Sequence, residues 1–223
     1  MTDANRPEAA ATRIAPITGL VFVALLVGGA LAIGLYDYLP SGDKMARYFE
    51  DNAGRVQVGA YLGALSAVFL VWFSGSVRSH LRPAEGGTGR LSAVAFGGGV
   101  AGAVVTAAAF SILSVAGARG GAGDATPQTA MVLYDLYGSL VGIAAPIALA
   151  ALVGAAALVG LRTGALAGWL AWSGAVLAIG LVSPFSYIFV GISLLWIVAL
   201  SVVLSVRRGR GEAPAVSSGP GGR

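Results

Sequence analysis

The sequence contains no cysteine among its 223 residues, so it forms no disulfide bond, no thiolate metal site and no cysteine nucleophile. It is also poor in charge, because Asp, Glu, Lys and Arg make up 11% of the residues, whereas soluble domains carry about 25%. A chain with so few charged residues cannot cover a surface that faces water. The single histidine, His80, has only Glu85 near it in the sequence, and a metal site needs three or four ligands.

What the sequence does contain is apolar residues, which make up 57% of the chain and give it a mean hydropathy of +0.82. They fall into six long runs that contain no Lys, Arg, Asp, Glu or His. Each run is near the roughly 20 residues that a helix needs to cross a hydrocarbon core of about 30 Å. The six predicted spans are 14–36, 56–77, 91–116, 136–161, 165–182 and 185–206.

The composition of these runs decides between helices and strands. A backbone in lipid must satisfy its own hydrogen bonds, and the runs do not alternate as the strands of a membrane β-barrel do. The last two runs are separate because Ser183-Pro184 lies between them and proline ends a helix. The sequence therefore predicts an all-α, polytopic membrane protein in which residues 14–206 form a bundle of six transmembrane helices.

The distribution of Lys and Arg predicts the orientation of this bundle. Six spans place four segments on the side of the termini, and these segments hold ten of the fourteen basic residues. The ten are Arg6, Arg13, Arg78, Arg82, Arg90, Arg162, Arg207, Arg208, Arg210 and Arg223. By the positive-inside rule both termini are cytoplasmic, in a multi-pass protein of a bacterial cell (plasma) membrane. Residues 1–13, and the basic, then Gly/Ser/Pro-rich tail 207–223, are expected to be disordered.

Small residues and one proline inside the spans bear on helix packing. GxxxG pairs let helix backbones approach closely, although glycine is so common here that the motif alone is weak evidence. The three pairs are Gly98/Gly102, Gly138/Gly142 and Gly164/Gly168. Pro146 lies inside the fourth span, where it is a candidate helix kink.

The first outer loop is predicted to contain a short amphipathic helix on the outer surface of the membrane. Ser41 is a suitable N-cap, Asp43 in the first turn is favoured by the helix dipole, and Gly54 is a natural stop. Its apolar face consists of Met45, Tyr48 and Phe49. We expect this segment to pack down onto the bundle rather than to form a lid over a ligand.

Three stretches of the chain resemble an uncharacterised family of small six-span bacterial integral membrane proteins, which is defined by a domain of unknown function. They are YFEDNAGRVQVGAYLGALSAVFLVWFSGSV, LRPAEGGTGRLSAVAFGGGVAGA and LRTGALAGWLAWSG, and the resemblance covers about residues 14–206. Relatives often carry a proline before the tryptophan of the last stretch, where this chain has Gly168. The resemblance implies a fold and a topology but no activity, so it assigns no catalytic residue and no cofactor.

Signals for an enzyme are nearly absent from the sequence. The stretch GGTGR at 86–90 lacks the GK[ST] ending of a phosphate-binding loop and is predicted to be a turn. FSGSV at 73–77 is not the G-x-S-x-G nucleophile elbow. We therefore expect a protein that is not an enzyme, with no catalytic, cofactor-binding or metal-binding residue. The net charge of +4 is explained by membrane topology and indicates no nucleic-acid partner.

Asp135, at the head of the fourth run, is the residue that most invites a functional interpretation. From 135 to 161 a helix extends about 39 Å, so an untilted helix places Asp135 beyond the hydrocarbon core, at the outer headgroups. Tyr134 and Tyr137 favour the same depth, and Arg55 is the expected partner of the carboxylate. These four residues form a candidate outer-face polar cluster. We favour an interfacial helix end for Asp135 over an acid that lines an outward-facing cavity.

Three classes of function remain open. The favoured one is a non-catalytic membrane component that binds a partner protein or a lipid, because no ionisable group lies near the midplane. The second is a small-solute transporter or channel that works as an oligomer without such groups. The third is a lipid-modifying enzyme that would use Asp135, Arg55 and the loop acids Asp43, Glu50 and Asp51. The expected partners are the lipid bilayer, and either further copies of the chain or a partner membrane protein.

Overall fold

The computed structural model describes residues 17–34 and 41–211, with side chains described as far as Val206. Within these residues every regular element is helical, which confirms the all-α prediction. The elements are α2 (Thr18–Ile33), α3 (Gly42–Asp51), α4 (Ala53–Glu85), α5 (Arg90–Gly121), α6 (Pro127–Ser139), the π-helical turn η2 (Leu140–Ala144), α7 (Ala145–Thr163), α8 (Gly168–Leu181) and α9 (Ser186–Gly211). Residues 1–13 and 212–223, which were predicted to be disordered, lie outside the described residues. The prediction of disorder was wrong for 207–211, because α9 continues as a helix to Gly211.

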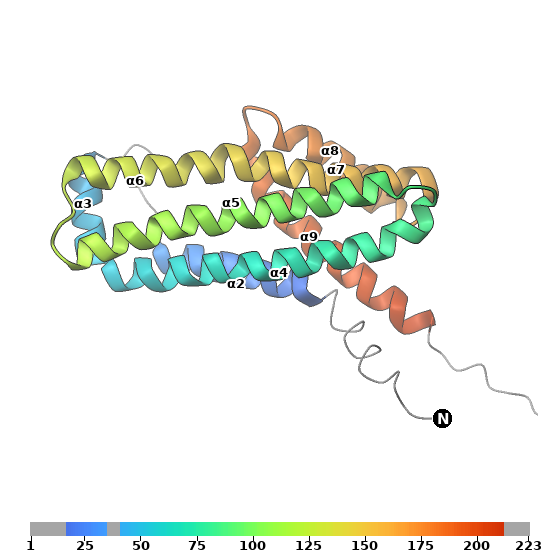
Figure 1. Ribbon diagram of the computed structural model, residues 1–223, viewed down its shortest axis with the longest axis horizontal. Helices are drawn as coiled ribbons and strands as arrows, with labels where there is room; N and C mark the ends of the chain where they lie inside the picture. Colours follow the sequence, from blue (N-terminus) through green and yellow to red (C-terminus); the bar gives the residue numbers. More distant parts are fainter. Residues whose placement is uncertain (1–16, 35–40, 212–223) are drawn as a thin grey trace, which may run out of the picture.

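The helices form an elongated bundle. Figure 1 shows α4, α5 and the α6–η2–α7 segment side by side along the long axis. α2 packs along α4, α8 packs on α7, and α9 crosses back to contact α2, so the helices close into a ring. We call the end that carries α3 the α3 end. The opposite end holds the α4–α5 and α7–α8 turns with Arg78, Arg82, Arg90 and Arg162, and we call it the arginine-rich end.

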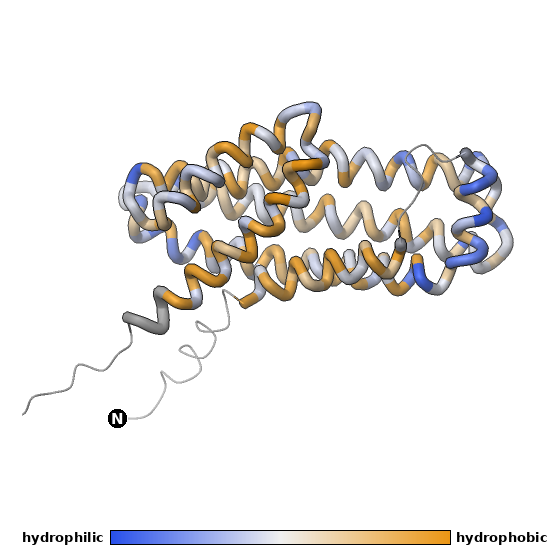
Figure 2. The backbone as a smooth tube through the Cα atoms, turned by 180° about the vertical axis from the view of Figure 1, so that it is seen from behind, coloured by the Kyte–Doolittle hydropathy of each residue, from blue (hydrophilic) through white to orange (hydrophobic). Residues whose placement is uncertain are grey.

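Within the described residues, four helical segments are long and apolar enough to cross a membrane, which supports a membrane protein. They are Ala53–Glu85, Arg90–Gly121, Pro127–Thr163 and Ser186–Val206. α2 and α8 are shorter apolar helices. Figure 2 shows hydrophilic residues gathered at the two ends and hydrophobic residues between them, as expected for a bundle that lies in a bilayer.

The observed helices differ in length from the predicted spans. α4 begins three residues before 56 and ends eight after 77, and α5 begins one residue before 91 and ends five after 116, because polar residues at the membrane surface continue the helices. The break at Ser183-Pro184 is observed, since α8 ends at Leu181 and α9 begins at Ser186. The α8–α9 turn reaches only the level of η2, about half-way along the bundle in Figures 1 and 2. The helical hairpin α8–α9 therefore covers mainly the arginine-rich half.

Close helix contacts depend on some of the predicted glycine pairs but not on others. A Cβ built on Gly98 would lie 2.6 Å from the backbone nitrogen of Leu152, so α5 and α7 meet backbone to backbone there. Gly59 and Gly63 are a further GxxxG pair, which packs against Gly29 of α2 and Phe110 of α5 respectively. The predicted pairs Gly138/Gly142 and Gly164/Gly168 have no atom within 4 Å of such a Cβ, so they pack no helix within the described chain.

The predicted loop helix is α3, which closes one end of the bundle. The Ser41 hydroxyl caps it by accepting a hydrogen bond from the Lys44 backbone N–H at 3.4 Å. Met45 and Phe49 are buried, and α3 packs against α5 and α6. Gly54 as the stop was wrong, because the helix ends at Asp51. The backbone and side-chain N–H groups of Asn52 both donate to the Tyr48 carbonyl there, at 3.0 Å each.

Candidate functional site

The two tyrosines of the predicted outer cluster belong to an apolar cluster at the α3 end. Tyr137 packs edge to face on Phe110, with ring centroids 5.7 Å apart and planes 74° apart. Tyr134 and Tyr137 are partly buried against a group that includes Met45 and Phe49. Their side chains therefore join α6 to α3 and α5.

The two charged members of the predicted cluster are not brought together. Asp135 is exposed, and within the described residues its carboxylate has no ion pair or hydrogen bond. Arg55 instead donates from Nε to the carbonyl of Ala32 at 3.2 Å and from Nη1 to Asn52 Oδ1 at 3.5 Å. The Ala32 carbonyl is one of the last in α2, where helix carbonyls lack partners. Arg55 is therefore used to tie α4 to α2, and the expected Asp135–Arg55 pair is absent from the described chain.

Pro146 lies just after an interruption of the α6–α7 helix. The five residues Leu140–Ala144 form a π-helical turn, and Pro146 is buried at the start of α7. Proline has no N–H to give to the Gly142 carbonyl four residues earlier. The Ser186 hydroxyl at the start of α9 donates to that carbonyl instead, at 3.0 Å. The irregular turn is thus satisfied by a neighbouring helix, as a membrane interior requires.

Replacement of Ser186 by alanine should destabilise the bundle. The Gly142 carbonyl would lose its side-chain donor in apolar surroundings, at an expected cost of about 1 kcal/mol in unfolding free energy. Ser205→Ala on the same helix is the matched control, because Ser205 donates only to the Ser201 carbonyl of its own helix. SDS titration of both variants measures the difference. Equal stability of the two variants would show that the bond between α9 and η2 contributes nothing.

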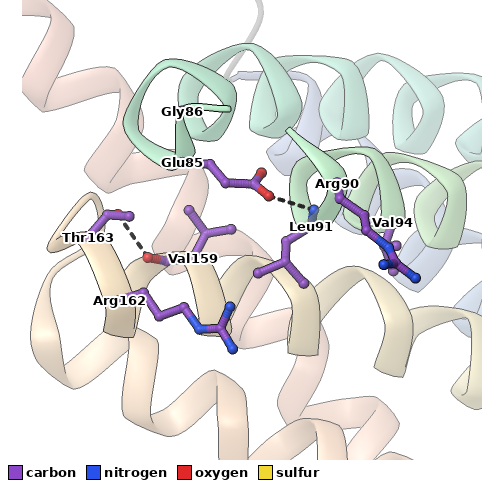
Figure 3. Close-up of a pocket in the computed structure, with 8 residues that line it drawn as sticks. All are labelled: Glu85, Gly86, Arg90, Leu91, Val94, Val159, Arg162 and Thr163. Atoms are coloured by element: carbon purple, nitrogen blue, oxygen red, sulfur yellow. Dashed lines mark hydrogen bonds between the residues drawn. The ribbon is translucent and has the colours of Figure 1, made fainter. Parts of the chain in front are cut away.

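A pocket of about 600 Å³ lies at the arginine-rich end, between the end of α4, the start of α5 and the end of α7. The residues that line it, and that define what we call the arginine pocket, are Glu85, Gly86, Arg90, Leu91, Val94, Val159, Arg162 and Thr163. Figure 3 shows Arg90 and Arg162 extending away from the α4–α5 turn, with the Leu91 side chain projecting between them. Two cations from different helices therefore border one hollow.

Glu85 caps the N-terminus of α5. Its two carboxylate oxygens accept hydrogen bonds from the backbone N–H groups of Leu91 and Ser92, at 2.7 and 2.8 Å. These N–H groups are among the first of α5 and lack helical partners. The intervening turn needs glycine, because Gly86, Gly87 and Gly89 all have positive φ. A carboxylate at a helix N-terminus also interacts favourably with the helix dipole.

The same contacts set the protonation of Glu85, which is the last residue of α4 and lies beyond the apolar segment of that helix. Desolvation acts to raise the pKa of its carboxyl. The backbone N–H groups of Ser92 and Leu91, the Ser92 hydroxyl and the charge of Arg162 together outweigh desolvation and hold the pKa below its ordinary value. The carboxyl is therefore ionised at neutral pH.

This lowered pKa predicts a pH-dependent stability difference. The ionised carboxylate stabilises the folded state above its ordinary pKa of 4.5, and the contribution is lost as pH falls through the lower folded-state pKa. Glu85→Gln should therefore be less stable than wild type at pH 7. At pH 3 the difference should shrink, because a protonated glutamate resembles glutamine. Melting temperatures at the two pH values measure the effect, and a difference that does not change with pH would contradict it.

Unlike Glu85, the two arginines of the pocket do not stabilise the fold through hydrogen bonds. Among the described residues, neither the Arg90 nor the Arg162 guanidinium has an ion pair or hydrogen bond. Thr163 is occupied, because its hydroxyl donates to the Val159 carbonyl at 2.8 Å and accepts from the Ala165 N–H at 3.2 Å. Within the described part of the chain no group of three or more His, Asp or Glu could hold a metal ion. The pocket can therefore bind an anion.

Sequence reasoning used these residues only to orient the bundle and did not identify the pocket. Arg90 and Arg162 lie 72 positions apart, and only the packing of α5 on α7 brings them to one hollow. One signal was present: an acid, Glu85, shortly before a glycine-rich turn and an apolar run suggests a helix cap. The cap would have placed the start of α5 beside the end of α4.

Comparisons with known proteins add no family or function. No protein-family model matches the sequence, and neither a curated protein nor a solved structure shows significant similarity to the chain. The resemblance to a six-span bacterial family stays a prediction.

Proposed function

We propose that the chain is a non-catalytic component of a bacterial cell membrane that acts by binding a lipid or a partner membrane protein. The arginine pocket carries this proposal. It offers two arginines that make no ion pair or hydrogen bond within the described residues, at the end of an apolar bundle, and its one acid is held as a helix cap. Such an arrangement favours binding of an anion over acid–base chemistry.

The interior of the bundle supports a binding role as well. The buried polar side chains of the described residues are all hydroxyls. Most of them donate to a carbonyl of their own helix, as Ser74 does to Leu70 at 2.7 Å and Ser201 does to Ile197 at 2.8 Å. Hydroxyls satisfied in this way leave no chain of polar groups for a proton or ion. The favoured function therefore needs no path through the bundle.

We further propose that the six predicted spans lie in the bilayer with both termini in the cytoplasm, the last two as a helical hairpin. The α3 end carries four basic residues, whereas the arginine-rich side carries seven, because the end of α9 adds Arg207, Arg208 and Arg210 to the four arginines there. This excess of basic residues fits the positive-inside rule, with the arginine-rich end inside. α8 is short, about 21 Å. The end of α9 stays on the arginine-rich side whether the α8–α9 turn crosses the bilayer fully or enters it part-way. A tag at Gly123 that reports a cytoplasmic location would contradict this topology.

Native mass spectrometry of the protein released gently from its own membrane tests the proposed function. A retained lipid or a second polypeptide would support it and would name the class of ligand. Release of the bare chain alone, together with solute uptake by vesicles that contain the purified protein, would contradict it.

A small-solute transporter that works as an oligomer is the second candidate, and one observation favours it. The helix is irregular at η2 and Pro146, and interrupted helices inside a membrane often line a substrate path. Asp135→Asn separates the two functions, because Asp135 is exposed and its replacement should leave folding intact. Loss of uptake in vesicles at unchanged protein level would favour the transporter.

A further inference from the structure

We propose that the arginine pocket holds the phosphate of one anionic phospholipid between Arg90 and Arg162. The inference deepens the proposed binding function by naming the ligand class and the residues that recognise it. Phosphate is the anion that arginine recognises best, because the planar guanidinium donates paired, charge-assisted hydrogen bonds to its oxygens. Two such groups from separate helices border the pocket, and neither makes an ion pair or hydrogen bond within the described residues.

The depth of the pocket indicates a lipid headgroup. Arg90 directly precedes the apolar part of α5, and Arg162 directly follows that of α7. Both guanidinium groups therefore lie at the boundary between apolar and polar residues, where lipid phosphates lie. Basic pockets between helices on this side of a membrane commonly bind acidic headgroups.

The apolar wall of the pocket distinguishes a lipid from a soluble phosphate. Leu91, Val94 and Val159 line it together with the arginines, and the Val94 side chain is 46% exposed. A soluble ion has no use for this wall, whereas a glycerol backbone and the start of an acyl chain can lie along it. The volume of about 600 Å³ is within the range of small-molecule sites.

The negative charge of Glu85 leaves the pocket net positive. Both of its carboxylate oxygens already accept backbone hydrogen bonds from α5. The ionisable residues that line the pocket are this one acid and the two arginines, so the pocket keeps a net positive charge. By holding the first turn of α5, Glu85 also fixes the backbone from which Arg90 extends.

Lipid titration by native mass spectrometry tests the site. Delipidated protein in neutral detergent is mixed with equal amounts of phosphatidylglycerol and phosphatidylcholine. Wild type should bind one phosphatidylglycerol in preference to phosphatidylcholine. The double variant Arg90→Gln/Arg162→Gln should bind it about tenfold more weakly, because charged hydrogen bonds are lost. The charge-matched control Arg82→Gln/Arg119→Gln changes arginines that do not line the pocket, and it should bind like wild type.

Two results would overturn the assignment. Binding of phosphatidylglycerol by the pocket variant at wild-type strength would show that the arginines do not hold the lipid. Displacement of the lipid by equal concentrations of inorganic phosphate or glycerol 1-phosphate would assign the site to a soluble phosphate. Both arginines are exposed, so the variant should keep the wild-type melting temperature, and the single variants serve if it does not. If the lipid titration overturns the lipid site, co-purification of a partner protein with both wild type and pocket variant would still support the broader binding function.

Discussion

Gly98→Val should force two helices apart, lowering the unfolding free energy by about 3 kcal/mol. Even a single added carbon at Gly98 would lie 2.6 Å from the Leu152 nitrogen, 2.8 Å from Ala151 Cβ and 2.9 Å from the Ala148 oxygen. Two of these three atoms belong to the backbone of α7 and cannot move aside as a side-chain tip can. The helices α5 and α7 must therefore separate, and SDS titration of the purified protein would measure the loss.

Gly97→Val is the matched control, because Gly97 is the adjacent residue of the same helix and no atom lies within 4 Å of its added Cβ. It should change stability by less than 1 kcal/mol, since valine and glycine differ little in helix propensity. Equal losses for the two variants would mean that valine harms α5 itself and that the α5–α7 approach is not the cause. Because Arg90 and Arg162 are held by these two helices, Gly98→Val should also weaken lipid binding at the arginine pocket.

Trp196→Ala should release α9 from the bundle and lower the unfolding free energy by about 3–5 kcal/mol. The side chain is 4% exposed, and its Nε1 donates to the Leu170 carbonyl of α8 at 2.9 Å. Its ring also fills the space at Gly174, where an added Cβ would lie 3.0 Å from the indole. Alanine leaves a cavity the size of the ring, and circular dichroism during SDS titration would record the loss.

Two further variants separate the contributions of Trp196. Trp172→Ala removes a tryptophan of α8 that is 67% exposed, and it should change stability by less than about 0.5 kcal/mol. Trp196→Phe keeps most of the ring and loses the hydrogen bond, at a cost of about 1 kcal/mol. If Trp172→Ala cost as much as Trp196→Ala, the burial of Trp196 would not explain the effect.

Local features of the fold were predictable because they depend on neighbouring residues. Ser41 caps α3, and Met45 and Phe49 share one face because they are four residues apart on a helix. Ser183-Pro184 separates α8 from α9 because proline cannot continue a helix. The turn at 86–90 was likewise readable from its glycines.

Features that depend on which helices meet were not predictable in the same way. Gly98/Gly102 and Gly138/Gly142 have the same spacing, but only the first pair lies at a contact between helices of the described chain. Arg55 and Asp135 were paired by their expected depth alone. Depth does not specify the angular position of a side chain around its helix, and Arg55 binds the end of α2 instead.

The sequence alone determined that the described chain is all helical, with helices long and apolar enough to cross a membrane. That outcome follows from composition and local order, because long apolar runs must satisfy their own backbone hydrogen bonds in lipid. Only the tertiary structure decided that Ser186 would donate to the Gly142 carbonyl, which Pro146 leaves without its helical donor. It also decided that Arg90 and Arg162 would border one pocket. These contacts join residues 44 and 72 positions apart along the chain. They form because side-chain shape and glycine spacing select which helix faces pack together.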